Sequence, residues 1–169
     1  MGLTQLLRGC SRPTVQCQPV PAATAHATPA GRSRPAGRPC AGTDPVVLQA
    51  AVLHDTVEDT DTSLEELTTH FGPQVAAVVA ELTDDKRLPK VQRKALQVEH
   101  APHKSAQAAL VKLADKTCNL RDIIASPPAD WPLQRRRDYF DWALQVVQGL
   151  PPVSPALRAA FDAAYAQRP

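Results

Sequence analysis

The stretch "SAQAALVKLADKTCNLRDIIAS", residues 105–126, is the longest segment with helical periodicity in the chain. Its apolar residues recur at spacings of three and four, which predicts a broad buried helix face. The pair Pro127–Pro128 follows directly and predicts the end of the helix. The apolar face comprises Leu110, Val111, Leu113, Ala114, Leu120, Ile123 and Ile124.

Helical patterns continue on both sides of this segment. Pro45 opens "PVVLQAAVLHDTVED", Thr62-x-x-Glu65 has the spacing of a capping box, and Gly72 is placed to end the helix that follows. Further helices are expected in "PQVAAVVAEL", "VQRKALQVEHA", "PLQRRRDYFDWALQVVQGL" and "SPALRAAFDAAYAQR", the last capped by Ser154. No segment alternates with period two over a useful length. The sequence therefore predicts an all-α fold of about six or seven helices.

The amino-terminal part has a different composition. Residues 1–45 contain seven prolines, and residues 1–43 carry five arginines but no lysine and no acid. Such a segment cannot bury enough apolar surface to offset its conformational entropy, so residues 1–44 are expected to form a disordered tail. Residues 45–168 are expected to form the folded domain.

Charge and composition exclude several classes of function. From residue 44 onward the chain has 14 basic and 17 acidic residues, a net charge of −3, which does not fit a nucleic-acid binder. No apolar run approaches the ~20 residues that span a bilayer. The cysteines match neither a zinc motif nor a disulfide framework, and we find no secretory signal, so a cytoplasmic location is expected. The arginine-bearing, acid-free start leaves a mitochondrial location as the alternative.

The stretch "AVLHDTVEDTDT", residues 51–62, gathers a histidine and acids at the end of a predicted helix. Glu58 lies four residues after His54, and Asp59 four after Asp55, so one continuous helix would place all four on a broad face. Carboxylates there would meet the negative end of the helix dipole, which a divalent cation would offset. A histidine beside carboxylates suits manganese, iron or zinc. The alternative is a solvated helix end.

Asp115 lies in the middle of the apolar helix 105–126. A buried carboxylate needs a cation, which could be a metal shared with the His54 cluster. The alternative is a local pairing with Lys112 or Lys116.

Three segments together resemble a known family: "AAVLHDTVEDTDTSLEEL", "FGPQVAAVVAELTDDKRLPK" and "LVKLADKTCNLRD". They are similar to the metazoan SpoT homologues (the HD domain-containing protein 3 family) and to the hydrolase domain of bacterial RelA/SpoT enzymes. The resemblance covers residue 46 to about 150 closely. It implies a helical HD domain that binds manganese and removes the 3′-pyrophosphate of guanosine tetra- and pentaphosphate (ppGpp), with NADPH as another substrate of the animal members.

The resemblance also implies roles for individual residues. His54, Asp55 and Asp115 would bind Mn²⁺, while Glu58 and Asp59 would position and activate the attacking water. The contacts to the nucleotide substrate would come from Lys90, Asn119, Arg135 and Tyr139. From the residues alone, Arg135 could equally lie on a solvated helix face and Tyr139 in the core. The oligomeric state is left undecided.

The family pattern fails upstream of residue 45. The family has a further histidine ligand about two dozen residues before the His-Asp pair, and nothing in residues 1–44 matches its motif. His26 lies in "AATAHATPAG", which has no helical pattern, so it is not expected to be a ligand. The HD bundle would then lack its usual first helices and expose apolar surface.

We interpret the break as an alternative first exon, a frameshift or a gene-model error. The alternative function is an impaired isoform that only binds nucleotide or a partner.

Overall fold

The computed structural model describes residues 44–169, in which helices are joined by loops and no strand occurs. The all-α prediction is confirmed. Residues 1–43 of the predicted tail, including His26, lie outside the described residues. The helices are α2 (Pro45–Leu53), α3 (Thr56–Asp59), α4 (Leu64–Phe71), α5 (Pro73–Leu82), α6 (Lys90–His100), the 3₁₀ turn η1 (Ala101–His103), α7 (Ala106–Ala125), α8 (Leu133–Gly149) and α9 (Pro155–Tyr165).

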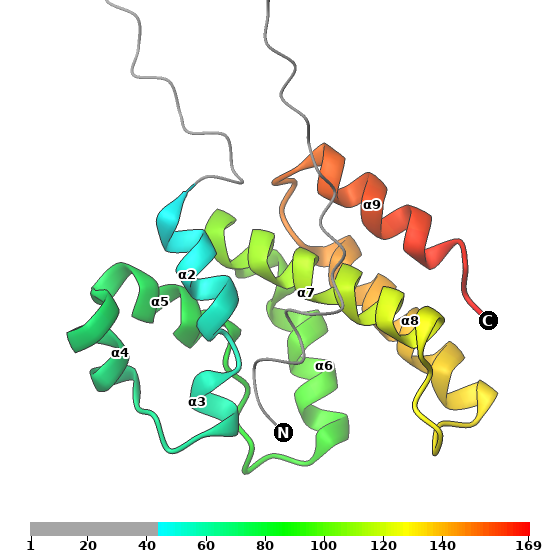
Figure 1. Cartoon of the computed structure of the whole chain (residues 1–169), viewed down its shortest axis with the longest axis horizontal. Helices are drawn as coiled ribbons and strands as arrows, with labels where there is room; N and C mark the ends of the chain where they lie inside the picture. Colours follow the sequence, from blue (N-terminus) through cyan, green and yellow to red (C-terminus); the bar gives the residue numbers. More distant parts are fainter. Residues whose placement is uncertain (1–43) are drawn as a thin grey trace, which may run out of the picture. The chain divides into compact units, whose positions relative to one another are not determined.

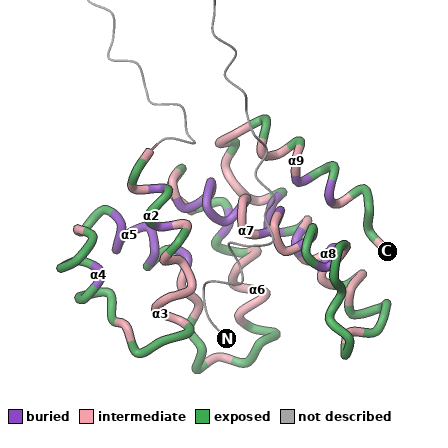
Figure 2. The backbone as a smooth tube through the Cα atoms, in the orientation of Figure 1, coloured by how far each residue is buried: buried purple, intermediate pink, exposed green. Residues whose placement is uncertain are grey.

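Helix α7 is the central element of the described chain, and it packs against α2, α5, α8 and α9 (Figure 1). Ser105 caps its start by accepting a hydrogen bond from the Ala108 amide. Its amino-terminal half contributes Ala108, Leu110 and Val111 to one hydrophobic cluster with α2, α4 and α5. Further along the helix, Leu113, Leu120 and Ile123 contribute to a second cluster with α8 and α9. Buried residues therefore follow α7 along its length (Figure 2).

The caps at the helix starts can be compared with those predicted from the sequence. Asp44 caps α2 by accepting a hydrogen bond from the Val46 amide at 2.9 Å, and Ser154 caps α9 as predicted. The capping box of α4 is formed by Ser63 and Glu66, so its predicted assignment to Thr62 and Glu65 was wrong by one residue. Ser63 and Glu66 exchange hydrogen bonds with each other's backbone amide.

The number and length of the helices also differ from the prediction. The described residues form eight α-helices because the segment predicted as one helix through His54 and Asp59 is broken into α2 and α3. Gly72 does end α4, with φ of 87°, a backbone conformation that residues with a side chain rarely adopt. Leu48 and Val52, one turn apart on α2, are 53% and 49% exposed, so apolar surface is uncovered on this helix as expected.

No helix among the described residues is both long enough and apolar enough to cross a membrane.

Candidate metal and nucleotide site

The His-Asp pair lies at the junction of α2 and α3. His54 is the residue after α2, and Asp55 precedes α3 with φ of −98° and ψ of −2°. Because the helix breaks here, Glu58 and Asp59 lie in the first turn of α3, not at the negative end of a longer helix. Since α3 is a single turn that ends at Asp59, it has little dipole of its own, and the long helix whose negative end would oppose these carboxylates does not form.

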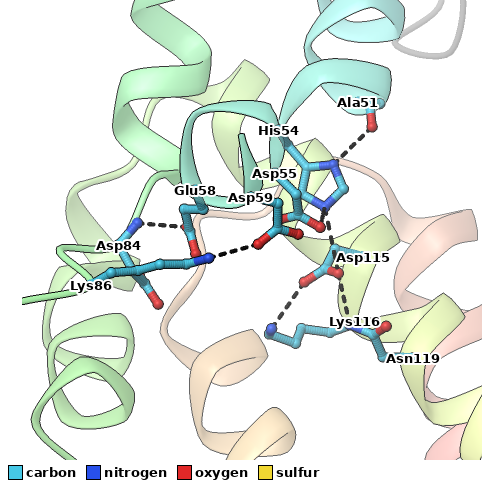
Figure 3. A network of polar contacts seen from close by, with 10 residues as sticks. All are labelled: Ala51, His54, Asp55, Glu58, Asp59, Asp84, Lys86, Asp115, Lys116 and Asn119. Carbon is cyan, nitrogen blue, oxygen red and sulfur yellow. Dashed lines mark hydrogen bonds and ion pairs between the residues drawn. The ribbon is translucent and has the colours of Figure 1, made fainter. Parts of the chain in front are cut away.

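His54 is oriented by contacts on both ring nitrogens (Figure 3). Its Nδ1–H donates to the carbonyl of Ala51 at 2.9 Å. Its Nε2 lies 3.2 Å from Asp55 Oδ2 and 3.8 Å from Asp115 Oδ1. The structure thus brings together three predicted residues from the α2–α3 junction and from α7.

These two carboxylates control the charge of the ring. Burial alone would lower the pKa of His54, because it disfavours the charged form. The hydrogen bonds and charges of Asp115 and Asp55 act in the opposite direction and raise this pKa to about 10. Without a metal, these carboxylates therefore favour the protonated ring, and a metal ion at Nε2 would have to replace that proton.

Asp115 has further partners on its own helix. Lys116 Nζ donates to Asp115 Oδ2 at 2.9 Å, and the Asn119 side-chain amide donates to Oδ1 at 2.7 Å (Figure 3). The side chains of Asp115 and Lys116 are only 15% and 5% exposed. Burial would raise the pKa of Asp115, but Lys116, His54 and Lys112 hold it well below its ordinary value. The sequence left two positions open for Asp115, a local ion pair with a lysine and a place facing the His54 cluster. The structure shows both, because Asp115 pairs with Lys116 and also faces His54.

Glu58 and Asp59 both point toward the loop between α5 and α6 (Figure 3). Glu58 Oε1 accepts a hydrogen bond from the backbone amide of Asp84 at 2.7 Å, and burial raises the pKa of Glu58. Asp59 Oδ1 pairs with Lys86 Nζ at 2.7 Å, and its side chain is 65% exposed. Glu58 is the more firmly positioned of the two.

A pocket of about 270 Å³ lies between α6 and α8. It contains three of the four predicted substrate contacts, Lys90, Arg135 and Tyr139. Asn119 does not line it but binds Asp115. Burial raises the pKa of Tyr139, while Lys116 and Asn119 act to lower it. The rest of the lining consists of Asp84, Arg93, Lys94, Gln97, Trp131 and Trp142.

The pocket and the His54 cluster are adjacent, because two residues that line the pocket also contact residues of the cluster. Asp84 lines the pocket and holds Glu58 through its amide. Trp142 lines the pocket, and its ring contacts Lys116, whose Nζ lies 4.5 Å from the ring centroid and which pairs with Asp115. The arrangement can therefore bind an anionic ligand next to a cluster of carboxylates.

The donor set fits a metal in kind. His54 has one nitrogen tied to a carbonyl, which fixes the ring, and the other directed at two carboxylates, the usual arrangement around a histidine ligand. One nitrogen and two carboxylates suit manganese, iron or zinc. In the described part of the chain, however, no three His, Cys, Asp or Glu side chains form a group that could hold an ion as it stands.

Several pocket residues were not predicted from the sequence. Arg93, Lys94 and Gln97 follow the predicted Lys90 at i+3, i+4 and i+7, which places four polar side chains on one face of α6. That stripe could have been read from the sequence. The hydrogen bond from the Asp84 backbone amide to Glu58 could not have been predicted, because every residue except proline has such an amide.

The helical fold, the adjacent His54 and Asp55, and the remote Asp115 define an HD-domain protein. The model of the HD-domain family matches residues 39–139. Guanosine-3′,5′-bis(diphosphate) 3′-pyrophosphohydrolase MESH1 of Homo sapiens is 57% identical over 126 residues, which are 75% of this chain and 70% of the human protein. The MESH1 protein of Drosophila melanogaster is 48% identical over the same shares of the two chains.

A solved structure agrees with these relatives. It is described as a metazoan orthologue of SpoT that hydrolyses ppGpp, and it is 48% identical with a TM-score of 0.72. The match covers 75% of this chain and 71% of that one. The chain therefore belongs to the HD-domain family, in the group of the metazoan SpoT homologues.

Proposed function

We propose that this protein is a manganese-dependent hydrolase that removes the 3′-pyrophosphate of guanosine 3′,5′-bis(diphosphate). The observation that carries the proposal is His54, whose Nε2 faces Asp55 and Asp115 at 3.2 and 3.8 Å while Nδ1 is tied to a carbonyl. The relatives named as pyrophosphohydrolases of this nucleotide support the choice of substrate.

Each residue has a definite task in this proposal. His54, Asp55 and Asp115 would hold the metal, which when bound supplies Lewis acidity next to the phosphate. Glu58, held by the Asp84 amide, orients the attacking water and accepts its proton. Asp59, next to Lys86, assists from the same turn of α3. Asn119 fixes the orientation of Asp115 from one turn further along α7.

Binding of the nucleotide would fall to the pocket between α6 and α8. Lys90 and Arg135 would neutralise phosphate charge, and Tyr139 would contact the ligand from the pocket wall. NADPH is a second proposed substrate, because it also combines a phosphate on a ribose hydroxyl with a diphosphate at a 5′ carbon. The same cationic pocket would serve both.

The test uses the full chain loaded with Mn²⁺ and measures pyrophosphate release from guanosine 3′,5′-bis(diphosphate). We expect His54→Ala to lower the rate at least a hundredfold and to abolish stoichiometric manganese binding. His70→Ala is the matched control, since His70 is exposed on α4 and has no part in the site. Phosphate release from NADPH is measured in parallel.

A folded chain that binds no manganese and releases no pyrophosphate would contradict the proposal. If that chain still bound the nucleotide, it would instead support the impaired, nucleotide-binding isoform. Turnover that is equal in the His54 and His70 variants would rule out the assignment of the site.

A further inference from the structure

The pocket between α6 and α8 has more positive charge than its own carboxylate can balance. Four cationic side chains line it, and Asp84 is the one acid among its lining residues. The Asp84 carboxylate is already engaged by the side-chain amide of Gln97. The lining cations are Lys90, Arg93, Lys94 and Arg135.

Repulsion among these cations is visible at Lys94. Burial lowers the pKa of Lys94, and the neighbouring charges of Lys90 and Lys116 lower it further; Asp138 acts in the opposite direction, and Arg135 adds a smaller lowering effect. An anion in the pocket would relieve this repulsion, because opposite charge favours the ammonium form.

Arg93 has an unused hydrogen-bond donor at the same place. Among the described residues, three buried side-chain nitrogen or oxygen atoms have no hydrogen-bond partner, and two of them line this pocket: Arg93 Nε and Gln97 Oε1. A buried polar atom without a partner costs roughly 1–3 kcal/mol, so native proteins rarely leave one unless a ligand or water completes it. A phosphate oxygen would satisfy Arg93, and a sugar hydroxyl could donate to Gln97.

Aromatic side chains hold two of these cations in place. Lys94 Nζ lies 4.5 Å from the ring centroid of Trp142, and the guanidinium carbon of Arg135 lies 4.4 Å from that of Trp131. The indole N–H of Trp142 also donates to the backbone carbonyl of Lys94 at 3.0 Å, which ties α8 to α6. Lys94 is thus prearranged with no ion pair to a carboxylate in the described part of the chain, whereas Arg135 also has a long, exposed pairing in which its Nη1 lies 3.8 Å from Asp130 Oδ2.

We propose that Arg93 and Lys94, together with Lys90 and Arg135, form a subsite for the diphosphate of the nucleotide that is not cut. This inference rests on the proposed function: if the 3′-pyrophosphate is attacked beside His54 and Glu58, the pocket next to them receives the 5′-diphosphate. Arg93 donates from Nε to a phosphate oxygen, and Lys94 contributes charge from the next position of the stripe. Both residues therefore determine specificity for nucleotides with a 5′-diphosphate.

The first experiment measures binding of GDP, which has the 5′-diphosphate but no 3′-pyrophosphate, to the full chain by titration calorimetry. We expect Arg93→Gln and Lys94→Gln each to weaken binding about tenfold or more, the size of effect seen when a hydrogen bond to a charged group is lost. Arg158→Gln is the matched control, because Arg158 is an exposed arginine on α9 paired with Asp162. It should leave binding unchanged.

The second experiment measures hydrolysis of guanosine 3′,5′-bis(diphosphate) by the same proteins. The variants should raise KM about tenfold and leave kcat within about threefold, because the subsite holds a part of the substrate that does not react. Arg93→Lys keeps the charge but loses the Nε donor, so it should fall between wild type and Arg93→Gln. If circular dichroism shows that Arg93→Gln is not folded, Arg93→Lys is used in its place.

The outcomes separate the two proposals. Wild-type protein that does not bind GDP, or folded variants with unchanged GDP affinity and KM, would overturn the subsite even if pyrophosphate is released. GDP binding that depends on Arg93 and Lys94 without any pyrophosphate release would support the subsite and contradict the proposed reaction.

Discussion

Asp115 is a residue on which three of the site's polar contacts converge. Its two oxygens face His54 and accept hydrogen bonds from Lys116 and Asn119. Lys116 is 5% exposed, so its charge is balanced within the protein and not by solvent. A buried charge that loses its partner is destabilising far beyond the worth of a surface ion pair.

Asp115→Asn should therefore lower the free energy of unfolding by about 3–5 kcal/mol, because Lys116 would keep a buried charge without its counterion. Urea denaturation at neutral pH of the protein without added metal measures the effect. The same exchange at Asp162, which is 53% exposed and paired with Arg158, should change stability by less than about 0.5 kcal/mol. Equal effects at the two positions would show that Lys116 does not depend on Asp115.

The sequence predicted which of these residues lie together, while their roles in catalysis and metal binding stay predictions. His54, Asp55 and Asp115 could be found because a histidine beside acids and an acid inside an apolar helix are conspicuous residue types. Residues such as Arg93 and Lys94 could not be assigned to a pocket, because a charged residue on a helix is usually solvated. Only the position of α8 opposite α6 shows that they face a pocket.

Among the elements, α9 is fastened to α8 by polar contacts near the carboxyl terminus. Arg168 donates two hydrogen bonds to the Asp141 carboxylate, at 2.7 and 2.6 Å, and the Tyr165 hydroxyl donates a third at 3.2 Å. The hydrogen bonds from Arg168 hold the pKa of Asp141 below its ordinary value. Ionised Asp141 therefore favours the packing of α9 on α8.

The sign of the pH dependence follows from this lowered pKa. The stability that Asp141 contributes is fully present above its unfolded pKa of about 3.9, and it is lost as the pH falls through the lower folded value. Asp141→Asn should lower Tm by roughly 1–3 °C from pH 5 to 8, and the difference from wild type should begin to shrink near pH 4 and vanish once the pH is below the lowered folded pKa. Thermal unfolding followed by circular dichroism at several pH values measures this. A constant difference down to pH 3 would contradict it.

The helices were easier to predict than their ends. Apolar periodicity located α5, α7, α8 and α9, since each must bury one face. The break between α2 and α3 was missed because the sequence around His54 and Asp55 contains neither glycine nor proline. It is stabilised by contacts that the sequence does not reveal, such as those of His54 with Ala51 and Asp115. The one-residue error in the capping box arose because Thr62 and Ser63 are both good caps.

For the described part of the molecule as a whole, α7 joins two hydrophobic clusters. Val153 and Leu157 also pack against both of them. Because α7 belongs to each cluster, neither can lose its packing without exposing part of the other. This predicts cooperative unfolding of the described helices, as for other small single domains.

Phe161→Ala in α9 tests that coupling. Phe161 is 0% exposed in the second cluster, so the substitution should cost about 3–5 kcal/mol. Hydrogen exchange should show amides of α5, in the first cluster, losing the same free energy as amides of α8. Phe71→Ala is the control, because Phe71 is 42% exposed on α4 and should cost about 1 kcal/mol or less. Unchanged exchange in α5 would show that the clusters unfold independently.

The placement of the aromatic side chains around the pocket has a practical consequence. The whole chain contains two tryptophans, and both Trp131 and Trp142 line the pocket between α6 and α8. The ring of Trp142 contacts the ammonium groups of Lys94 and Lys116, each 4.5 Å from its centroid. All indole fluorescence of the unlabelled protein therefore originates at this pocket, next to charges that a ligand would neutralise. The intrinsic tryptophan fluorescence should therefore change when a ligand occupies the pocket.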